Sequence, residues 1–350
     1  MPVFRLSSYG VFVLAVSCIT FLLYFLSSQQ SIAITKSPVV SIRRLLTTSV
    51  HLIEKSGQLI IDYKNKNPIK NHTKISLEKE EIFTDVDILS HNYLSNGFLK
   101  SIPGIQLISE EKSQDYSYWD SVELPSNEDL SIINRVDNKD LYLPLSDLTV
   151  WIDPLDATQE FSEGLYEYVT IMVCVAFKDH PIIGIVSQPF HKKIYWAWEH
   201  FGVSEDLENL YNTAKDTPNS LDTLNITLSR SHLSPGIEDA LRKSFKDPVR
   251  IIRSGGSGYK TLQLIEKKAS LYIHPESIKK WDICAPNVLL NAVGGGLTNI
   301  EPFNQPIDYS SHKSNHINRK EGIFGYTESE LANKYKMELK KFLKTYQQTN

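Results

Sequence analysis

In the first half of the chain, apolar positions recur first at helical spacing and then in strand-like runs. From residue 41 to about 63, leucines and isoleucines follow helical spacing behind Ser41, which is suited to be an N-cap. A second helix is expected after Asp87, and a short apolar strand over 105–108. A polar stretch over 112–144 has no convincing period and predicts a functional or irregular loop. Further on, a β-meander is predicted by the runs VTIMVCVAF, IIGIVS and KIYWAW.

In the second half, helical and strand-like patterns alternate and no internal repeat is present. Helices are expected at about 236–245, 258–267 and 283–293, and strands at 250–252 and 270–273. This order predicts an α+β region followed by an α/β region, with helices and sheets in layers. A charged stretch that ends near residue 217 marks the expected boundary between subdomains covering 41–216 and 217–350.

The N-terminus carries an uncharged apolar run from Tyr9 to Leu26, and its roughly 18 residues are near the minimum for a membrane span. A cleavable signal peptide is the alternative. The run is longer than the usual apolar core of about 7–15 residues, and no clear A-x-A cleavage site follows it. An uncleaved signal-anchor is therefore favoured, with residues 1–27 as cytosolic tip and anchor and 28–40 as a polar stem.

Two N-glycosylation sequons, at Asn71 and Asn225, favour a luminal body and hence a type II, single-pass topology. The chain has 350 residues and a formal net charge of −4, with both signs interspersed. This composition argues against a nucleic-acid polymer as partner, because such a partner would need a basic face. Cys18 lies in the apolar run, so at most one disulfide joins Cys174 and Cys284.

Four acidic clusters stand at the ends of apolar elements: TDVD (84–87), SEE (109–111), DPLD (153–156) and WD (281–282). In DPLD the proline fixes a turn, which lets Asp153 and Asp156 converge while the Leu155 carbonyl points to the same side. A single cluster of this kind is more often a solvated turn or a helix cap. Four clusters without matching basic partners predict a site for a hard cation, since Mg²⁺ prefers oxygen ligands.

Other motifs leave two interpretations open. GGSGYK (255–260) precedes a helix, and its backbone N–H groups could face a nucleotide or simply form an ordinary connection. His232 could be a cap, a surface residue or a ligand contact. Lys279 and Lys280 are expected to be a solvated pair, and Trp281 is expected to pack in the core beneath the cation site.

The order T-x-x-D, E-E, W-I-D-P-L-D-x-T and K-W-D-x-C-A resembles the inositol monophosphatase superfamily of magnesium-dependent, lithium-sensitive phosphatases, over about residues 41–345. The resemblance implies a layered α-β-α-β-α sandwich of the α/β class behind the N-terminal transmembrane helix. SRSH, GGSGYK and KASLYIH are similar to the bisphosphate nucleotidase branch. Ala157, where most members carry glycine, resembles the Golgi-resident members of that branch.

The resemblance also implies roles for individual residues. Spacing in the family favours Asp87 over Asp85 and Glu110 over Glu111, a choice that the residues alone leave open. Asp87 and Thr158 would orient the attacking water. Two or three Mg²⁺ ions would be held by Asp87, Glu110, Asp153, the Leu155 carbonyl, Asp156 and Asp282. The substrate would contact Ala157, Thr158, Ser229, His232, Gly256, Ser257 and Lys260.

The expected reaction is removal of the 3′-phosphate of adenosine 3′,5′-bisphosphate, a by-product of sulfotransferases, to give AMP at the Golgi membrane with a luminal catalytic domain. The substrate is thus a small-molecule nucleotide. The alternatives are an inositol phosphate phosphatase and, in a different class, a catalytically inert luminal binding protein. The oligomeric state is left open, with a homodimer as one option.

Overall fold

A computed structural model describes residues 17, 19–20, 37–76, 79–112, 115, 119–126, 129–136, 140–215, 223–231 and 235–349. Residues Val39–Asn350 form one compact unit, separate from Met1–Pro38. The predicted membrane-spanning run lies almost wholly outside the described residues, as does the predicted boundary between residues 216 and 217. Among the described residues, no helix has both the length and the apolar character that crossing a bilayer requires.

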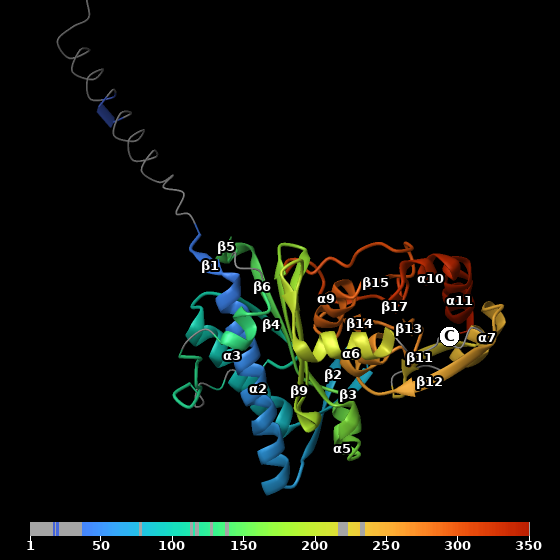
Figure 1. The fold of residues 1–350 in the computed structure, drawn as a ribbon, viewed down its shortest axis with the longest axis horizontal. Coiled ribbons are helices and arrows are strands. Elements are labelled where there is room, and N and C mark those ends of the chain that lie inside the picture. Colours follow the sequence, from blue (N-terminus) through green and yellow to red (C-terminus); the bar gives the residue numbers. More distant parts are fainter. Residues whose placement is uncertain are drawn as a thin grey trace, which may run out of the picture. The chain divides into compact units, whose positions relative to one another are not determined.

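The unit that begins at Val39 has five layers, helices and sheets alternating, which confirms the predicted α-β-α-β-α sandwich (Figure 1). The first layer contains α2 (Ile42–Lys66) and α3 (Asp85–Ser101). The middle layer contains α6 (Glu205–Lys215), α8 (Ser257–Ile265) and α9 (Cys284–Ala292). The last layer contains α7 (Ile237–Ser244), α10 (Ser329–Lys334) and α11 (Lys336–Thr349).

The first sheet has six strands in the order β10-β9-β8-β7-β6-β4. Its strands are β4 (Gln106–Ser109), β6 (Leu148–Asp156), β7 (Thr170–Phe177), β8 (His180–Gln188), β9 (Lys193–Trp198) and β10 (Gly202–Val203). β7, β8 and β9 are antiparallel neighbours, which confirms the predicted meander. β4 and β6 are parallel, so SEE and DPLD both emerge at the same end of this sheet.

The second sheet has five strands in the order β12-β11-β13-β17-β15. They are β11 (Leu224–Ser229), β12 (Val249–Ser254), β13 (Leu271–His274), β15 (Gly296–Asn299) and β17 (Ile323–Tyr326). Three two-stranded ladders complete the unit: β1 (Val39–Ser41) with β5 (Tyr142–Pro144), β2 (Asn71–Ser76) with β3 (Lys79–Thr84), and β14 (Ile278–Lys279) with β16 (His316–Ile317).

Alternation along the strands explains why both sheets are covered on both faces. On β7, Ile171 and Val173 pack with α2 and α3, whereas Met172 and Cys174 pack with α8 and α9. Successive side chains of a strand point to opposite faces, so an uninterrupted apolar run fits a sheet between two helical layers. A third apolar core joins the second sheet to α7 and α11.

The polar stretch 112–144 was expected to be a loop, and its described parts pack against the first helical layer. It contains α4 (Leu130–Ile133) and β5. Lys100 on α3 donates to the carbonyl oxygens of Trp119 and Val122, both at 3.1 Å. Val122 is buried against this layer. The stretch lacks a regular period because single contacts, rather than one amphipathic element, hold it in place.

Helix α9 docks on the first sheet at a notch. A Cβ atom on Gly184 would lie 2.6 Å from the carbonyl oxygen of Ala285, so only glycine permits this approach. Cys174, the neighbour of Gly184 across β7 and β8, forms a disulfide with Cys284. The sequence allowed a disulfide only between these two cysteines, and the structure contains it. The docking places Asp282, two residues before Cys284, above the end of β6.

Candidate active site

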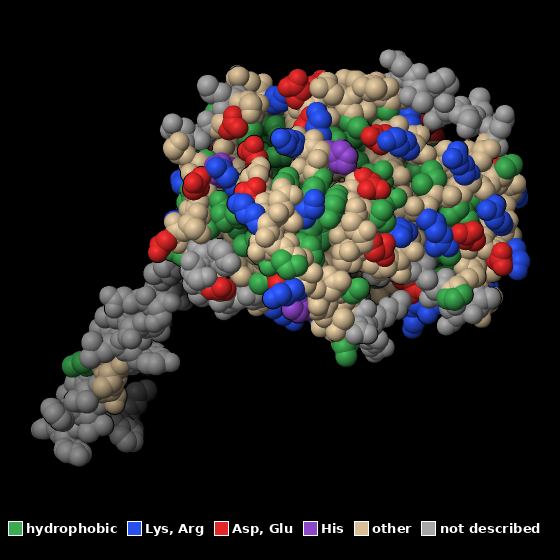
Figure 2. Space-filling model, turned by 90° about the horizontal axis from the view of Figure 1, so that it is seen from below, with side chains coloured by type: hydrophobic (Ala, Val, Ile, Leu, Met, Phe, Trp, Pro, Cys, Tyr) green, Lys and Arg blue, Asp and Glu red, His purple; other side chains and the backbone are tan. Residues whose placement is uncertain are grey.

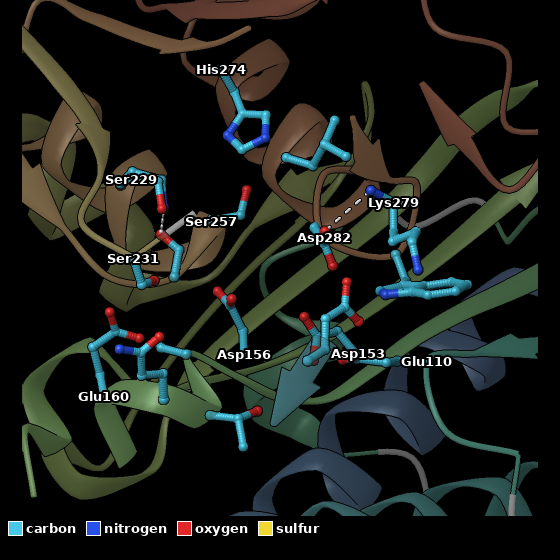
Figure 3. A pocket seen from close by; sticks show the side chains of 18 of the residues that line it. Glu110, Asp153, Asp156, Glu160, Ser229, Ser231, Ser257, His274, Lys279 and Asp282 are labelled. Carbon is cyan, nitrogen blue, oxygen red and sulfur yellow. Dashed lines mark hydrogen bonds between the residues drawn. The ribbon is translucent and has the colours of Figure 1, made fainter. Parts of the chain in front are cut away.

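A cavity of about 320 Å³ contains the predicted acidic residues on one side and the serine- and glycine-rich segments on the other (Figure 3). Its walls come from the ends of β4 and β6, the start of α5 (Thr158–Ser162), the loop before α8, and the segment from β13 to β14. Of the predicted residues, the cavity is lined by Glu110, Asp153, Leu155, Asp156, Ala157, Thr158, Ser229, Gly256, Ser257, Lys260 and Asp282.

A bulge at the end of β6 turns both aspartates of DPLD toward the cavity. Asp153 still pairs with Met172 on β7, but the register shifts before Asp156 pairs with Thr170. Pro154 lies within this shift and has no N–H group to lose from the ladder. The backbone N–H of Leu155 donates to Asp153 Oδ1 at 3.2 Å. Asp153 and Asp156 therefore converge as predicted, and the cause is a bulge in the strand as well as the proline turn.

Ala157 links this bulge to α5 in the left-handed conformation, with φ of 70°. Glycine adopts this conformation without steric cost, which explains the glycine expected here in related sequences. The next residue, Thr158, has its Oγ1 2.9 Å from Asp87 Oδ1 and 3.0 Å from the Leu155 carbonyl oxygen. Its single proton can be donated to only one of these acceptors at a time.

The structure distinguishes the two aspartates of TDVD. Asp87 is 1% exposed, and its Oδ2 accepts from the backbone N–H of Thr84 at 2.8 Å in a capping box at the start of α3. Burial raises the pKa of Asp87 to about 6. Asp85 instead bonds His72 at 2.7 Å and Tyr63 at 3.3 Å, away from the cavity. Asp87 is therefore the aspartate of TDVD that is hydrogen-bonded to Thr158.

The expectation that the acidic clusters have no basic partner is wrong. Lys74, on β2, lies 3.1 Å from Glu110 Oε1 and forms a still closer ion pair with Glu111. Burial raises the pKa of Glu110 to about 7, although Lys74 opposes the shift. Burial disfavours the charged form of Lys74, but the two glutamates outweigh it and raise the pKa of this lysine. Lys74 was missed because it lies 36 residues before Glu110, on a different ladder.

The glycine-rich segment before α8 has a function that the sequence did not suggest, which is to hold Asp156. Asp156 Oδ2 accepts from the backbone N–H of Gly258 at 2.8 Å and from Thr170 Oγ1 at 3.0 Å. A Cβ atom on Gly256, whose φ is 62°, would lie 2.8 Å from that same oxygen. The glycines therefore permit a close backbone approach to a carboxylate, while Gly256 and Ser257 also line the cavity.

Lys260, a predicted substrate contact, is held in place rather than mobile. The side chain is buried, its ammonium bonds the Gly256 carbonyl oxygen one turn earlier, and it lies 5.3 Å from the centroid of the Tyr272 ring. Burial lowers the pKa of Lys260, while the nearby charge of Asp156 opposes the shift. Lys260 is thus a fixed charge beside Asp156.

Asp282 enters the cavity from the segment between β14 and α9, and its Oδ2 accepts from the backbone N–H of Lys279 at 3.2 Å (Figure 3). Trp281 is buried, as predicted. The expectation of a solvated lysine pair is wrong. Lys280 is 3% exposed and lies over the Trp151 ring, and Lys279 lines the cavity over Trp281. Their long apolar stems pack on the indoles, which a charge-based interpretation overlooks.

On the opposite wall, Ser229 at the end of β11 lines the cavity as predicted, whereas His232 lies outside the described residues. The lining residues that were not predicted include Glu160, His274 and Glu276. Glu160 is 1% exposed and 3.5 Å from Arg230. A Cβ atom on Gly255 would lie 2.5 Å from the Glu160 carboxyl carbon, so the glycine permits the close approach of Glu160.

The donor set fits a hard divalent cation. Burial, and then the charges of Glu110 and Asp156, raise the pKa of both Asp153 and Asp282 well above the ordinary range. This repulsion is what a bound cation would relieve. Within the described part of the chain, no three acidic, histidine or cysteine side chains are grouped so that they alone could hold a metal ion. Mg²⁺ commonly keeps several waters, so an open set of oxygen donors suits it.

Acidic and basic side chains are interspersed over the face of the protein seen in Figure 2. This pattern agrees with the mixed charge of the sequence and its formal net charge of −4. The cavity differs from this face, because carboxylates gather in it at the end of β6.

Comparisons with known proteins agree with this geometry. The sequence profile of the inositol monophosphatase family matches residues 41–332. The putative inositol monophosphatase 3 of Drosophila melanogaster is 36% identical over 278 residues, covering 79% of this chain and 76% of that protein. The Golgi-resident adenosine 3′,5′-bisphosphate 3′-phosphatase of Homo sapiens is 34% identical over 273 residues, covering 75% and 72%.

Among solved structures, an IMPase/NADP phosphatase complexed with Mg²⁺ and phosphate has a TM-score of 0.54 and 16% identity, covering 81% of this chain and 92% of that one. At this identity the likeness concerns the fold. Fold and site together define a phosphoric monoester hydrolase. The chain belongs to the inositol monophosphatase family.

Proposed function

We propose that this protein hydrolyses the 3′-phosphate of adenosine 3′,5′-bisphosphate to give AMP, with two or three Mg²⁺ ions. The observation that carries the proposal is the division of the cavity into an acidic wall and a serine- and glycine-rich wall. The first suits a cation-bound phosphate, and the second suits a nucleotide. The name of the human relative supports this choice of substrate.

The acidic wall provides the chemistry. The proposed metal ligands are Asp153, Asp156, Glu110, Asp282 and the Leu155 carbonyl, with Asp87 for a further ion. Bound Mg²⁺ would neutralise phosphate oxygens and acidify water. Asp87 and Thr158, 2.9 Å apart, would hold the attacking water in line with the phosphorus. Phosphoryl transfer depends mainly on positioning and charge stabilisation, so no covalent nucleophile is needed.

The opposite wall would hold the rest of the substrate. Ser229 and Ser257 offer hydroxyl groups, and Lys260 offers a positive charge at a fixed position. Backbone N–H groups of Ala157 and Thr158 would contact the reacting phosphate. α5 has only five residues, so these contacts rest on the individual N–H groups rather than on a helix dipole. His232 remains a predicted contact outside the described residues.

We place the catalytic unit in the Golgi lumen, on a type II signal-anchor. The buried Cys174–Cys284 disulfide supports an oxidising compartment, and the human relative is named Golgi-resident. The two sequons differ in their surroundings. Asn71 is exposed, whereas Asn225 lies in β11, an interior strand of the second sheet, and the threonine of its sequon is buried and bonded to Gln263.

Endoglycosidase treatment of the full-length protein tests the location. We expect a mass shift that Asn71→Gln abolishes and Asn225→Gln leaves in place. Protection of the body from protease added outside sealed microsomes should accompany it. Digestion of the body from the cytosolic side would contradict the luminal location.

The function itself is tested by phosphate release from the full-length protein, with and without Mg²⁺. The panel contains adenosine 3′,5′-bisphosphate, adenosine 3′-monophosphate and inositol 1-phosphate. We expect Mg²⁺-dependent release and preference for the bisphosphate. Preference for inositol 1-phosphate would favour the second candidate, which the name of the Drosophila relative suggests. Binding of the bisphosphate without release from any ester would indicate an inert binding protein.

A further inference from the structure

We propose that Ser90 and Ser56, two buried serines of the first helical layer, are positioning residues for the metal-binding turn of β6. This inference rests on the proposed function, because it takes Asp153 and the Leu155 carbonyl as metal ligands. Ser90, on α3, donates its hydroxyl proton to the Pro154 carbonyl oxygen at 2.7 Å. Ser56, on α2, has its Oγ 2.7 Å from Ser90 Oγ.

The direction of these two hydrogen bonds follows from counting protons. A serine hydroxyl has one proton to donate and lone pairs to accept. Ser90 uses its proton on Pro154, so Ser56 must donate to Ser90. Both serines are 0% exposed, so water does not substitute for either partner. A chain of two hydrogen bonds thus runs from α2 through α3 to the bulge of β6.

The chain ends at the peptide bond that separates the two proposed ligands. The Pro154 carbonyl accepts from Ser90, and the N–H of the same peptide group donates to Asp153 Oδ1 at 3.2 Å. This peptide group is therefore held at both ends. Its orientation sets where the Asp153 carboxylate and the following Leu155 carbonyl point, so Ser90 acts on the metal site without touching the metal.

Another buried serine provides a matched comparison. Ser49 is also 0% exposed on α2, and its hydroxyl donates at 2.7 Å to the Leu45 carbonyl oxygen in its own helix. Its removal costs a buried hydrogen bond of the same type without reaching β6. Any effect specific to the Ser56–Ser90 chain must therefore appear as a difference from Ser49→Ala.

The test measures Mg²⁺ binding by isothermal titration calorimetry on the full-length protein and on Ser90→Ala, Ser56→Ala and Ser49→Ala. We expect Ser90→Ala to weaken Mg²⁺ binding about tenfold, the low end for loss of a group that supports metal ligands. Ser56→Ala should weaken Mg²⁺ binding about three- to fivefold. In this variant Ser90 loses the hydrogen bond from Ser56 but keeps its own hydrogen bond to Pro154. Ser49→Ala should leave Mg²⁺ affinity unchanged while lowering the melting temperature comparably.

A second readout separates positioning from general damage. With saturating Mg²⁺, kcat of Ser90→Ala should stay within about threefold of wild type, since the ligands themselves are intact. Equal Mg²⁺ affinity in Ser90→Ala and Ser49→Ala, with wild-type binding intact, would overturn this inference alone. If Ser90→Ala does not fold, Ser56→Ala against Ser49→Ala decides it by the same criterion. A wild-type protein that binds no Mg²⁺ would overturn the proposed function as well.

Discussion

The two walls of the cavity are built in different ways. On the acidic wall, Asp153, Asp156 and Thr158 come from one continuous stretch, and each is fixed by a backbone or hydroxyl partner. On the serine- and glycine-rich wall, Ser229, Ser257 and His274 come one at a time from separate strands and helices of the second sheet region. A motif specifies the Asp153–Thr158 part of the first wall locally, whereas Glu110, Asp282 and the whole second wall depend on the packed fold.

The largest effect is expected from removing a proposed metal ligand from the acidic wall. Asp282→Asn should cost about a hundredfold or more in kcat, as loss of a key electrostatic group does. The same change should raise the melting temperature without Mg²⁺. Burial and neighbouring carboxylates raise the pKa of Asp282 in the folded state, so its charged form opposes folding above its ordinary pKa, and a neutral amide does not.

Activity assays and thermal unfolding, each with and without Mg²⁺, check this prediction together. Asp85→Asn is the matched control, since Asp85 is an acidic residue outside the cavity. It should leave kcat near the wild-type value. Near-normal activity of Asp282→Asn at ordinary Mg²⁺ concentrations would contradict the proposal that the acidic wall binds the metal.

A substitution with an intermediate expected effect tests the serine- and glycine-rich wall. Lys260→Ala should lower kcat/KM for adenosine 3′,5′-bisphosphate by roughly ten- to a hundredfold, the range for one charge-assisted contact. Adenosine 3′-monophosphate should be barely affected because it lacks the second phosphate. Kinetics on both substrates, with Lys268→Ala as an exposed control, make the comparison. Equal losses on both substrates would mean that Lys260 acts through Asp156 rather than through the substrate.

The smallest effect concerns the junction between the walls. Ala157→Gly should remove the steric cost of a left-handed non-glycine residue, partly offset by the greater freedom of glycine in the unfolded chain. We expect a net stabilisation of about 0.5 kcal/mol and little change in kcat. Urea unfolding measures the first and steady-state kinetics the second. A loss of stability would show that the alanine methyl group makes a favourable contact.

The sequence predicted the layered fold and the acidic wall because both follow from short-range patterns. Continuous apolar strands indicated sheets covered on both faces, and DPLD carries its turn within four residues. It could not predict the ion pair of Lys74 with Glu110 and Glu111, the burial of Lys280, or the approach of Gly255 to Glu160. Each joins segments far apart in the chain, and each buries a charged side chain of a type that is usually exposed.

The notch at Gly184 has a consequence for how variants of this protein should be interpreted. The residue does not line the cavity, yet any side chain there would push against the backbone of α9, and Asp282 lies immediately before that helix. In a mutational scan scored by activity, position 184 should therefore group with the acidic residues rather than with its neighbours in the sheet. A prediction of mutational effects based only on distance from the cavity would therefore underestimate the effect of substitutions at Gly184.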